Sequence, residues 1–385
     1  MARPLDGVFV VALEQAVAAP FATRQLADLG AEVLKVERRG DGDFARHYDT
    51  AMSGSSSFFV WANRGKQSIE LDMKDPDDRA TFDQLVAGAD VFIQNLSPSA
   101  AERLGVLADQ LREKHPTLIA CDVSGYGMGG PRTDDKAYDL AIQAEGGAIA
   151  LTGTPEQAIK VGFSAADISA AMYSLSSILA ALYRKQATGE GASVEVSMLE
   201  SLAEWTAAPT YNAVGNGAVP ARSGHRHTMI APYGLYGLAD GTDVLVGVQS
   251  NRDWAAFAEH VLLDEALVDD PRFADNPDRI ANIDDLEAII NRSFGGAPAD
   301  EILQRLQSSK VTHSKVNDPL ALWQHDQLRS RDRFMTVETP TGAAEMYKPP
   351  FNISDTDEVA ATVPQLGEDG TDLVSRILRR GAVGD

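Results

Sequence analysis

Short apolar runs alternate with helical patterns through residues 1 to about 200, and this alternation constrains the fold more than any other feature of the chain. The runs have the length and the Val, Ile and Leu content of buried strands. Stretches such as residues 75–89 and 99–115 separate them as helices. Strand, helix and strand repeated in this way predict parallel pairing in a doubly wound α/β sheet. The predicted strands are residues 8–13, 31–37, 68–73, 90–95, 117–123 and 193–198.

Basic residues follow several of these predicted strands. Arg38, Lys74 and Lys136 come after strands, and Arg103 lies one helical segment beyond another. Ligands of doubly wound sheets bind beyond the carboxyl ends of the strands, so we expect these side chains to share one rim. Gathered there they would suit a polyphosphate, although each one alone is typical of a solvated surface charge.

The alternation of strand and helix patterns ends after residue 205. Residues 206–230 are rich in Gly and Pro and predict a linker, whereas 231–325 contain a hairpin signal followed by helical patterns. We therefore expect a large Rossmann-like domain at 1–205 and a smaller α+β domain at 231–325. Residues 326–385, with two short strands and a last short helix, are expected to return to the large domain.

Charge and cysteine content narrow the class of protein. The 385 residues include 34 Lys and Arg against 56 Asp and Glu, a formal net charge of −22, which argues against nucleic acid and anionic membranes as partners. The one cysteine, Cys121, excludes an intrachain disulfide and a Cys-based zinc site. It lies in a predicted strand, so we expect a buried, unreactive thiol. A reducing, cytoplasmic location is expected.

An acidic residue begins the longest apolar helical pattern, at 161–187. Ser164 followed by Asp167 has the spacing of a capping box. The helix dipole favours the ionised form of an acid in this first turn, so we expect Asp167 to be a carboxylate, and a possible nucleophile, at neutral pH. An acid here can equally serve only as a cap. Because serines and Asp167 interrupt the apolar run, a core helix fits better than a membrane span.

Two further motifs are weaker. The glycine loop at 125–130 follows a strand, but the sequence after it does not open a helix, so a nicotinamide-binding site is not expected. His225, Arg226 and His227 lack a nearby carboxylate pattern, and we expect an exposed or anion-facing loop rather than a metal site.

Several segments in order resemble the family III CoA-transferases, over nearly the whole chain and more weakly between about 205 and 330. The segments are residues 4–11, 26–43, 63–76, 89–105, 136–147, 162–170, 188–201 and 364–372. The resemblance implies an interlocked homodimer with acyl-CoA and a carboxylic acid as substrates. It places Asp167 at the nucleophile and Asp139 at the acidic position beside it. The positions implied to hold coenzyme A (CoA) are Arg38, Leu71, Lys74, Asn95, Leu96, Arg103 and Lys136.

Departures from the family pattern favour some members over others. Tyr138 and Gly237 stand where the racemase branch has histidine and glutamate, which argues for transfer. Val17 replaces the glutamine of the oxalate enzyme and that enzyme's long glycine loop is missing, which argues against oxalate and formyl-CoA. A short dicarboxylic acid is favoured by the basic side chains that would suit a second carboxylate, namely Arg222, His225, Arg226 and His227.

The function we expect is CoA transfer between an acyl-CoA and a carboxylic acid through an aspartyl anhydride and an aspartyl-CoA thioester on Asp167. Two alternatives stay open: an acyl-CoA racemase or intramolecular CoA migrase of the same family, and a CoA-binding protein without catalysis. The acid pair is not predictable, since a pocket's discrimination can depend on one methylene.

Overall fold

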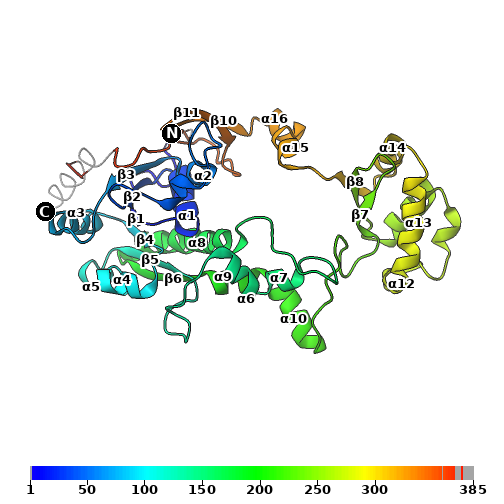
Figure 1. Cartoon of the computed structure of the whole chain (residues 1–385), viewed down its shortest axis with the longest axis horizontal. Helices are drawn as coiled ribbons and strands as arrows, with labels where there is room; N and C mark the ends of the chain where they lie inside the picture. Colours follow the sequence, from blue (N-terminus) through cyan, green and yellow to red (C-terminus); the bar gives the residue numbers. More distant parts are fainter. Residues whose placement is uncertain (1, 358, 369–373, 376–385) are drawn as a thin grey trace. The chain divides into compact units, whose positions relative to one another are not determined.

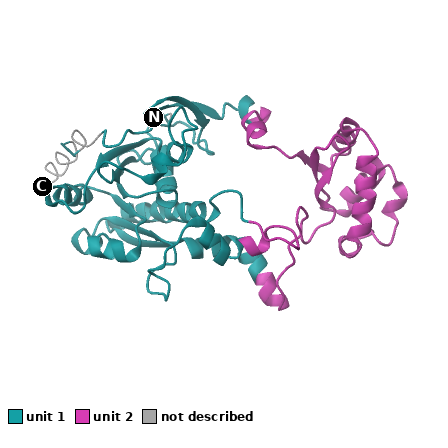
Figure 2. Cartoon of the chain, viewed as in Figure 1, with its two compact units in different colours: residues 1–148, 160–210, 328–385 teal, residues 149–159, 211–327 magenta. Residues whose placement is uncertain are grey.

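The computed structural model describes residues 2–357, 359–368 and 374–375 (Figure 1). The chain forms two compact units, shown in different colours in Figure 2. The first comprises residues 1–148, 160–210 and 328–385, and the second comprises 149–159 and 211–327. Each unit has its own cluster of buried apolar side chains. The segment expected to be a linker contains helix α10, Ala207–Asn216.

The first unit is built on a six-stranded sheet in which every neighbouring pair is parallel. The strand order is β3-β2-β1-β4-β5-β6, so the direction of winding reverses between β1 and β4. This confirms the predicted doubly wound sheet. The strands are β1 Phe9–Leu13, β2 Glu32–Glu37, β3 Lys66–Glu70, β4 Val91–Gln94, β5 Ile119–Ser124 and β6 Ala192–Ser197.

Helices cover both faces of this sheet. Successive strand residues point to opposite faces, and in β1 Val10 belongs to one apolar cluster while Val11 belongs to the other. Both faces are therefore buried, as expected for a parallel sheet. One face packs against α1 (Ala18–Asp28) and α8 (Ala165–Thr188). The other packs against α3 (Pro76–Ala87), α4 (Pro98–Leu104) and α5 (Ala108–Lys114).

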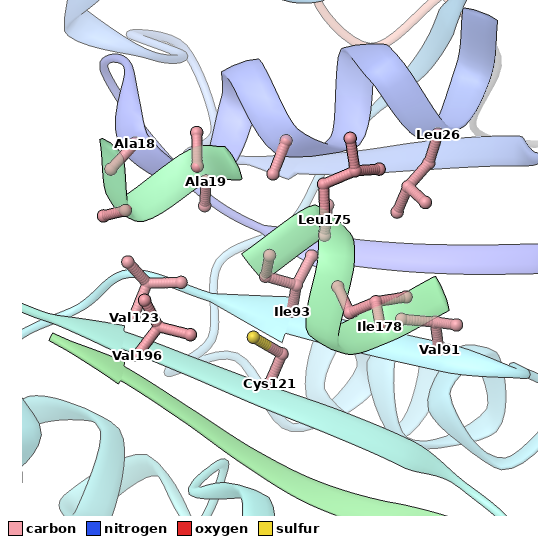
Figure 3. Close-up of a cluster of buried hydrophobic side chains, with 14 of the residues drawn as sticks. Ala18, Ala19, Leu26, Val91, Ile93, Cys121, Val123, Leu175, Ile178 and Val196 are labelled. Atoms are coloured by element: carbon pink, nitrogen blue, oxygen red, sulfur yellow. The ribbon is translucent and has the colours of Figure 1, made fainter. Parts of the chain in front are cut away.

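Helix α8 is a core element of the first unit. Figure 3 shows Leu175 and Ile178 of α8 in the same layer of apolar side chains as Cys121 of β5. By length and composition alone α8 could cross a membrane, but half of its most apolar stretch is buried within the protein. Cys121 is fully buried in β5, which confirms the predicted buried strand thiol, and burial raises its pKa.

Shorter elements complete the first unit. The predicted strands after residue 330 form an antiparallel hairpin of β10 (Phe334–Thr339) and β11 (Gly342–Tyr347). This hairpin packs against η1 (Phe44–His47) and α2 (Ser57–Asn63) through a small apolar cluster. Helices α6 Asp139–Glu145 and α9 Met198–Trp205 also belong to this unit, while α7 Ala148–Leu151 and α16 Asp326–Ser330 each span a boundary between the two units. The expected C-terminal helix lies largely outside the described residues.

The second unit is a small antiparallel sheet with helices. The predicted hairpin is confirmed as β7 (Tyr233–Gly237) and β8 (Asp243–Gly247), and β9 (Thr312–Lys315), which was not predicted, pairs with β8. Its core is aromatic, with Trp254 and three phenylalanines among its members. The helices are α11 Asn251–Ala256, the π-helix η2 Phe257–Leu262, η3 Glu265–Val268, α12 Asn276–Ala281, α13 Ile283–Gly295, α14 Ala299–Ser309 and α15 Pro319–Trp323.

Candidate active site

The helix that carries Asp167 begins next to a second acidic side chain. Helix α8 begins at Ala165, directly after Ser164, but no side-chain hydrogen bond from Ser164 caps it within the described structure. Oδ1 of Asp139 instead accepts hydrogen bonds from the N–H groups of Ala166, at 2.8 Å, and Asp167, at 3.3 Å. The predicted capping box is therefore wrong, because a carboxylate distant in sequence satisfies the first N–H groups of α8.

Gln143 holds this capping carboxylate in place. Its Nε2 donates to Oδ2 of Asp139, 2.7 Å away, and to the carbonyl of Phe163, 3.1 Å away. Its Oε1 accepts a hydrogen bond of 2.9 Å from the N–H of Val161. Gln143 is only 1% exposed, so all of its polar groups must be paired inside the protein. This one amide therefore joins α6 to the segment that leads into α8.

Asp167 is less acidic than the helix dipole alone would make it. Burial, and then the nearby charge of Asp139, raise the pKa of Asp167 from 3.8 to about 7. Burial and the charge of Asp139 thus oppose the ionisation that the helix dipole favours. The stabilising N–H groups at the start of α8 are used by Asp139, while the half-buried Asp167 keeps the cost of desolvation and of like-charge repulsion.

A cavity of about 560 Å³ opens beside Asp139, and its wall includes Ser164 and Ile168, which lie on either side of Asp167 in the sequence, but not Asp167 itself. Its wall comes from α2, from the start of α6 and from the segment that leads into α8. The lining is largely apolar, but it includes the carboxylate of Asp139. The lining residues are Ser57, Phe58, Trp61, Asp139, Leu140, Lys160, Gly162, Phe163, Ser164 and Ile168.

Aromatic side chains surround this area. Phe58 contacts Trp61, with ring centroids 6.3 Å apart, and Tyr48, with centroids 5.6 Å apart. Burial, and then the charges of Asp43 and Asp167, raise the pKa of Tyr48, which places this phenol in the electrostatic neighbourhood of Asp167. Tyr138, which precedes Asp139, is 72% exposed.

The residues predicted to hold CoA follow the carboxyl ends of parallel strands or lie one element beyond them. Arg38 follows β2, Lys74 follows β3 and Lys136 follows β5, and all three side chains are exposed at this edge of the sheet. Arg103 is exposed in the last turn of α4, one short helix away from the edge. Leu71 is different, because its side chain is buried in the apolar core beneath this edge.

Asn95 connects two loops at the reversal of strand order. Its Nδ2 donates to the carbonyl of Gln15 at 2.8 Å and its Oδ1 accepts from the N–H of Gln15 at 2.9 Å, which joins the loop after β4 to the loop after β1. The N–H of Leu96 donates to the side chain of Gln94. Val17, directly before α1, is buried. The crevice between such loops is where doubly wound folds bind ligands.

The basic residues proposed for a second carboxylate belong to the second unit and have partners there. Arg222 donates to the carbonyls of Thr154 at 2.7 Å and Pro155 at 3.0 Å. Arg226 forms an ion pair of 3.3 Å with Glu287. The ring of His225 accepts a hydrogen bond from a backbone N–H of β7, and His227 stacks on Tyr233. Among the described residues no group of His, Cys, Asp and Glu is arranged to hold a metal ion.

A buried charge network, which the sequence analysis did not find, lies under the loop after β1. Nζ of Lys66 contacts Oε1 of Glu14 at 2.6 Å, and Nζ of Lys35 contacts Oδ2 of Asp43 at 2.9 Å. All four side chains are fully buried. Oδ1 of Asp43 accepts a hydrogen bond from the N–H of Ala16, whose φ of 62° is left-handed. The network therefore supports a strained backbone position, a feature that clusters at functional sites.

The comparisons with known proteins agree with this architecture. A crystal structure described as a CaiB/BaiF family protein from Brucella suis superimposes with a TM-score of 0.87 at 30% identity, over 98% of this chain and 100% of that one. The chain is 32% identical over 374 residues to the acetyl-CoA:oxalate CoA-transferase of Acetobacter aceti, covering 96% of this chain and 95% of that protein.

A human relative is matched at similar length. The succinyl-CoA:glutarate CoA-transferase of Homo sapiens is 30% identical over 387 residues, which cover 98% of this chain and 86% of that protein. The sequence profile described as CoA-transferase family III matches residues 5–370. The chain therefore belongs to CoA-transferase family III and is an enzyme of that class.

Proposed function

We propose that this enzyme moves CoA from an acyl-CoA to a carboxylic acid through covalent intermediates on Asp167. The observation that carries the proposal is the pairing of Asp167 with Asp139 at the start of α8, beside a cavity of about 560 Å³. A carboxyl group whose pKa is about 7 is ionised in a large fraction of molecules at neutral pH. It is also more basic than an ordinary carboxylate, which favours nucleophilic attack.

Transfer begins with two steps on the donor. An oxygen of Asp167 attacks the thioester carbonyl, the carbon–sulfur bond breaks, and CoA leaves as a thiolate with a mixed anhydride left behind. The thiolate then attacks the side-chain carbonyl of Asp167, the anhydride carbon–oxygen bond breaks, and the donor acid leaves. The product is an aspartyl-CoA thioester. The acceptor carboxylate repeats both steps in reverse, which regenerates the carboxylate of Asp167.

The tetrahedral oxyanions need hydrogen-bond donors, worth about 3 kcal/mol each. Either the N–H groups at the start of α8 or a glycine segment could supply these donors, but the N–H groups at the start of α8 already have acceptors. Ala165 donates to the carbonyl of Phe163, and Ala166 and Asp167 donate to Asp139. We therefore assign oxyanion stabilisation to a glycine segment, and Gly162 in the cavity wall is the candidate. Asp139 has a positioning role, since it fixes the helix start and raises the pKa of Asp167.

Three further assignments complete the proposal. Arg38, Lys74, Asn95, Leu96, Arg103 and Lys136 bind the CoA nucleotide at the rim of the sheet, where exposed cations suit phosphates. The enzyme is a cytoplasmic interlocked homodimer, which light scattering after gel filtration tests. The acid is a dicarboxylate, as the names of the oxalate and glutarate relatives suggest for those proteins.

Isotope transfer tests the mechanism. With an acceptor acid whose carboxylate carries a heavy oxygen isotope, each turnover leaves one labelled oxygen on Asp167, because the acceptor oxygen bridges the second anhydride. Mass spectrometry of the Asp167 peptide after many turnovers should show the label. Transfer directly between donor and acceptor would leave this peptide unlabelled while product still forms, and that result would overturn the proposal.

A further inference from the structure

One cation stands in the wall of the cavity beside Asp139. Lys160 lines this cavity together with the apolar side chains of Phe58, Trp61 and Phe163. The aromatic wall suits a carbon skeleton, since apolar pockets with a few placed polar groups bind small molecules. Among the described residues that line the cavity, Lys160 is the one with a positively charged side chain.

Lys160 is not committed to another charged residue. Its Nζ lies 3.3 Å from the carbonyl oxygen of Val161, and no carboxylate in the described part of the chain lies within ion-pair distance. Arg222 and Arg226 differ from it, because their guanidinium groups already bind backbone carbonyls or Glu287 within the second unit. A free cation in a cavity is therefore available to a ligand.

Charges in and near the cavity also fix the orientation of a dicarboxylic acid. One carboxylate must reach Asp167 to react, and Asp139 is next to that position. The second carboxylate is repelled by these two acids, so its energy is lowest where a positive charge meets it. Lys160 supplies that charge in the same cavity wall.

We propose that Lys160 binds the second carboxylate of a dicarboxylic acid whose skeleton lies against Phe58, Trp61 and Phe163. This inference rests on the proposed function and names the residue that recognises the second carboxylate of its acid. A carboxylic acid without the second charge would bind the same wall without the ion pair. The enzyme therefore prefers a dicarboxylate to the monocarboxylate of equal length.

The test compares glutarate with pentanoate as acceptors for the intact enzyme. Lys160→Met shortens the side chain by one atom and removes the charge. It should lower kcat/KM for glutarate about tenfold, the loss expected for one hydrogen bond to a charged group, and change pentanoate less than twofold. Lys160→Arg keeps the positive charge and should retain most of the wild-type kcat/KM for glutarate. Lys114→Met is the matched control, because Lys114 is exposed at the end of α5, and it should change neither acid.

Three results would overturn the inference. If Lys160→Met lowers kcat/KM equally for both acids, Lys160 does not recognise the second carboxylate. If only the KM for the acyl-CoA rises, Lys160 binds CoA. If kcat/KM for glutarate does not change, Lys160 takes no part in binding the acid. In each case a CoA adduct still forming on Asp167 would leave the proposed function standing. If the wild-type enzyme forms no such adduct, the proposed function fails and this inference fails with it.

Discussion

Replacing Asp139 with Asn should make Asp167 more acidic and move the pH dependence of catalysis. The amide oxygen of Asn can still accept from the N–H of Ala166, which Asp139 contacts at 2.8 Å, so the start of α8 keeps a cap. The negative charge beside Asp167 is lost. The substitution therefore removes the charge and the hydrogen bond of 2.7 Å that Oδ2 of Asp139 accepts from Gln143, while the cap on α8 remains.

The expected change in the pKa of Asp167 follows from the two causes that raise it. Its pKa rises from 3.8 to about 7, with burial as the larger cause and Asp139 as the second. Asp139 thus accounts for less than half of a rise of about three pH units, and we take its share as about one unit. The pKa of Asp167 should fall to about 6 in Asp139→Asn and stay above its ordinary value.

The assay is the rate of CoA adduct formation on Asp167 in a single turnover, measured between pH 5 and 8.5 and scaled to each variant's own plateau. The wild-type rate should rise with pH through a midpoint near 7, because the nucleophile must be ionised. The midpoint of Asp139→Asn should lie about one pH unit lower. Asp134→Asn removes an exposed carboxylate and should leave the midpoint in place. An unchanged or higher midpoint in Asp139→Asn would refute the reasoning.

Three other substitutions test the surroundings of the site. A Cβ on Gly125 would lie 2.1 Å from Cβ of Ala137, so Gly125→Ala should displace the segment before Asp139 and lower kcat at least tenfold; unchanged kinetics would contradict this packing. Lys66→Met leaves the buried Glu14 without its closest cation and should cost about 3–5 kcal/mol in urea unfolding, which a loss below 1 kcal/mol would contradict. Asp167→Asn should stabilise the fold at pH 8 by up to about 4 kcal/mol, because Asp167 is harder to ionise in the folded protein than in the unfolded one. The gain should shrink as the pH falls from 7 toward 4 and should be small at pH 4, where the folded wild-type side chain is protonated. An equal effect at both pH values would count against the raised pKa.

The fold was predictable where local patterns decide structure. Each of the six parallel strands overlaps a predicted strand, although β3 begins at Lys66, two residues early, and has only one apolar side chain, Ile69. The turn at Asp240 and Gly241 joins β7 to β8 as its residue types indicate. Strand β9 escaped detection because its residues, Thr312–Lys315, are polar and mostly exposed. Helix α10 lies in a segment whose glycines and prolines predicted a linker.

The site was predictable by position but not in its electrostatics. The sequence predicted the start of α8 and Asp167 in its first turn, yet it assigned the helix cap to Ser164. The residue that caps the helix, Asp139, lies 27 positions before Ala166, too far for a pattern of neighbouring residues to indicate it. The buried charges were missed for a similar reason. Lys35 interrupts an apolar strand, which was the available signal, but its partner Asp43 lies in a loop and only the folded chain brings them together.

The central claim is that Asp167 becomes covalently bound to CoA, and mass spectrometry tests it most directly. The enzyme is incubated with an acyl-CoA without acceptor, digested at low pH, and the peptide that contains Asp167 is weighed in wild-type, Asp167→Asn and Asp134→Asn proteins. The account predicts the mass of a CoA thioester on this peptide in the wild type and in Asp134→Asn, and its loss in Asp167→Asn. Turnover of acyl-CoA and acid by Asp167→Asn, or an adduct on another residue, would contradict it.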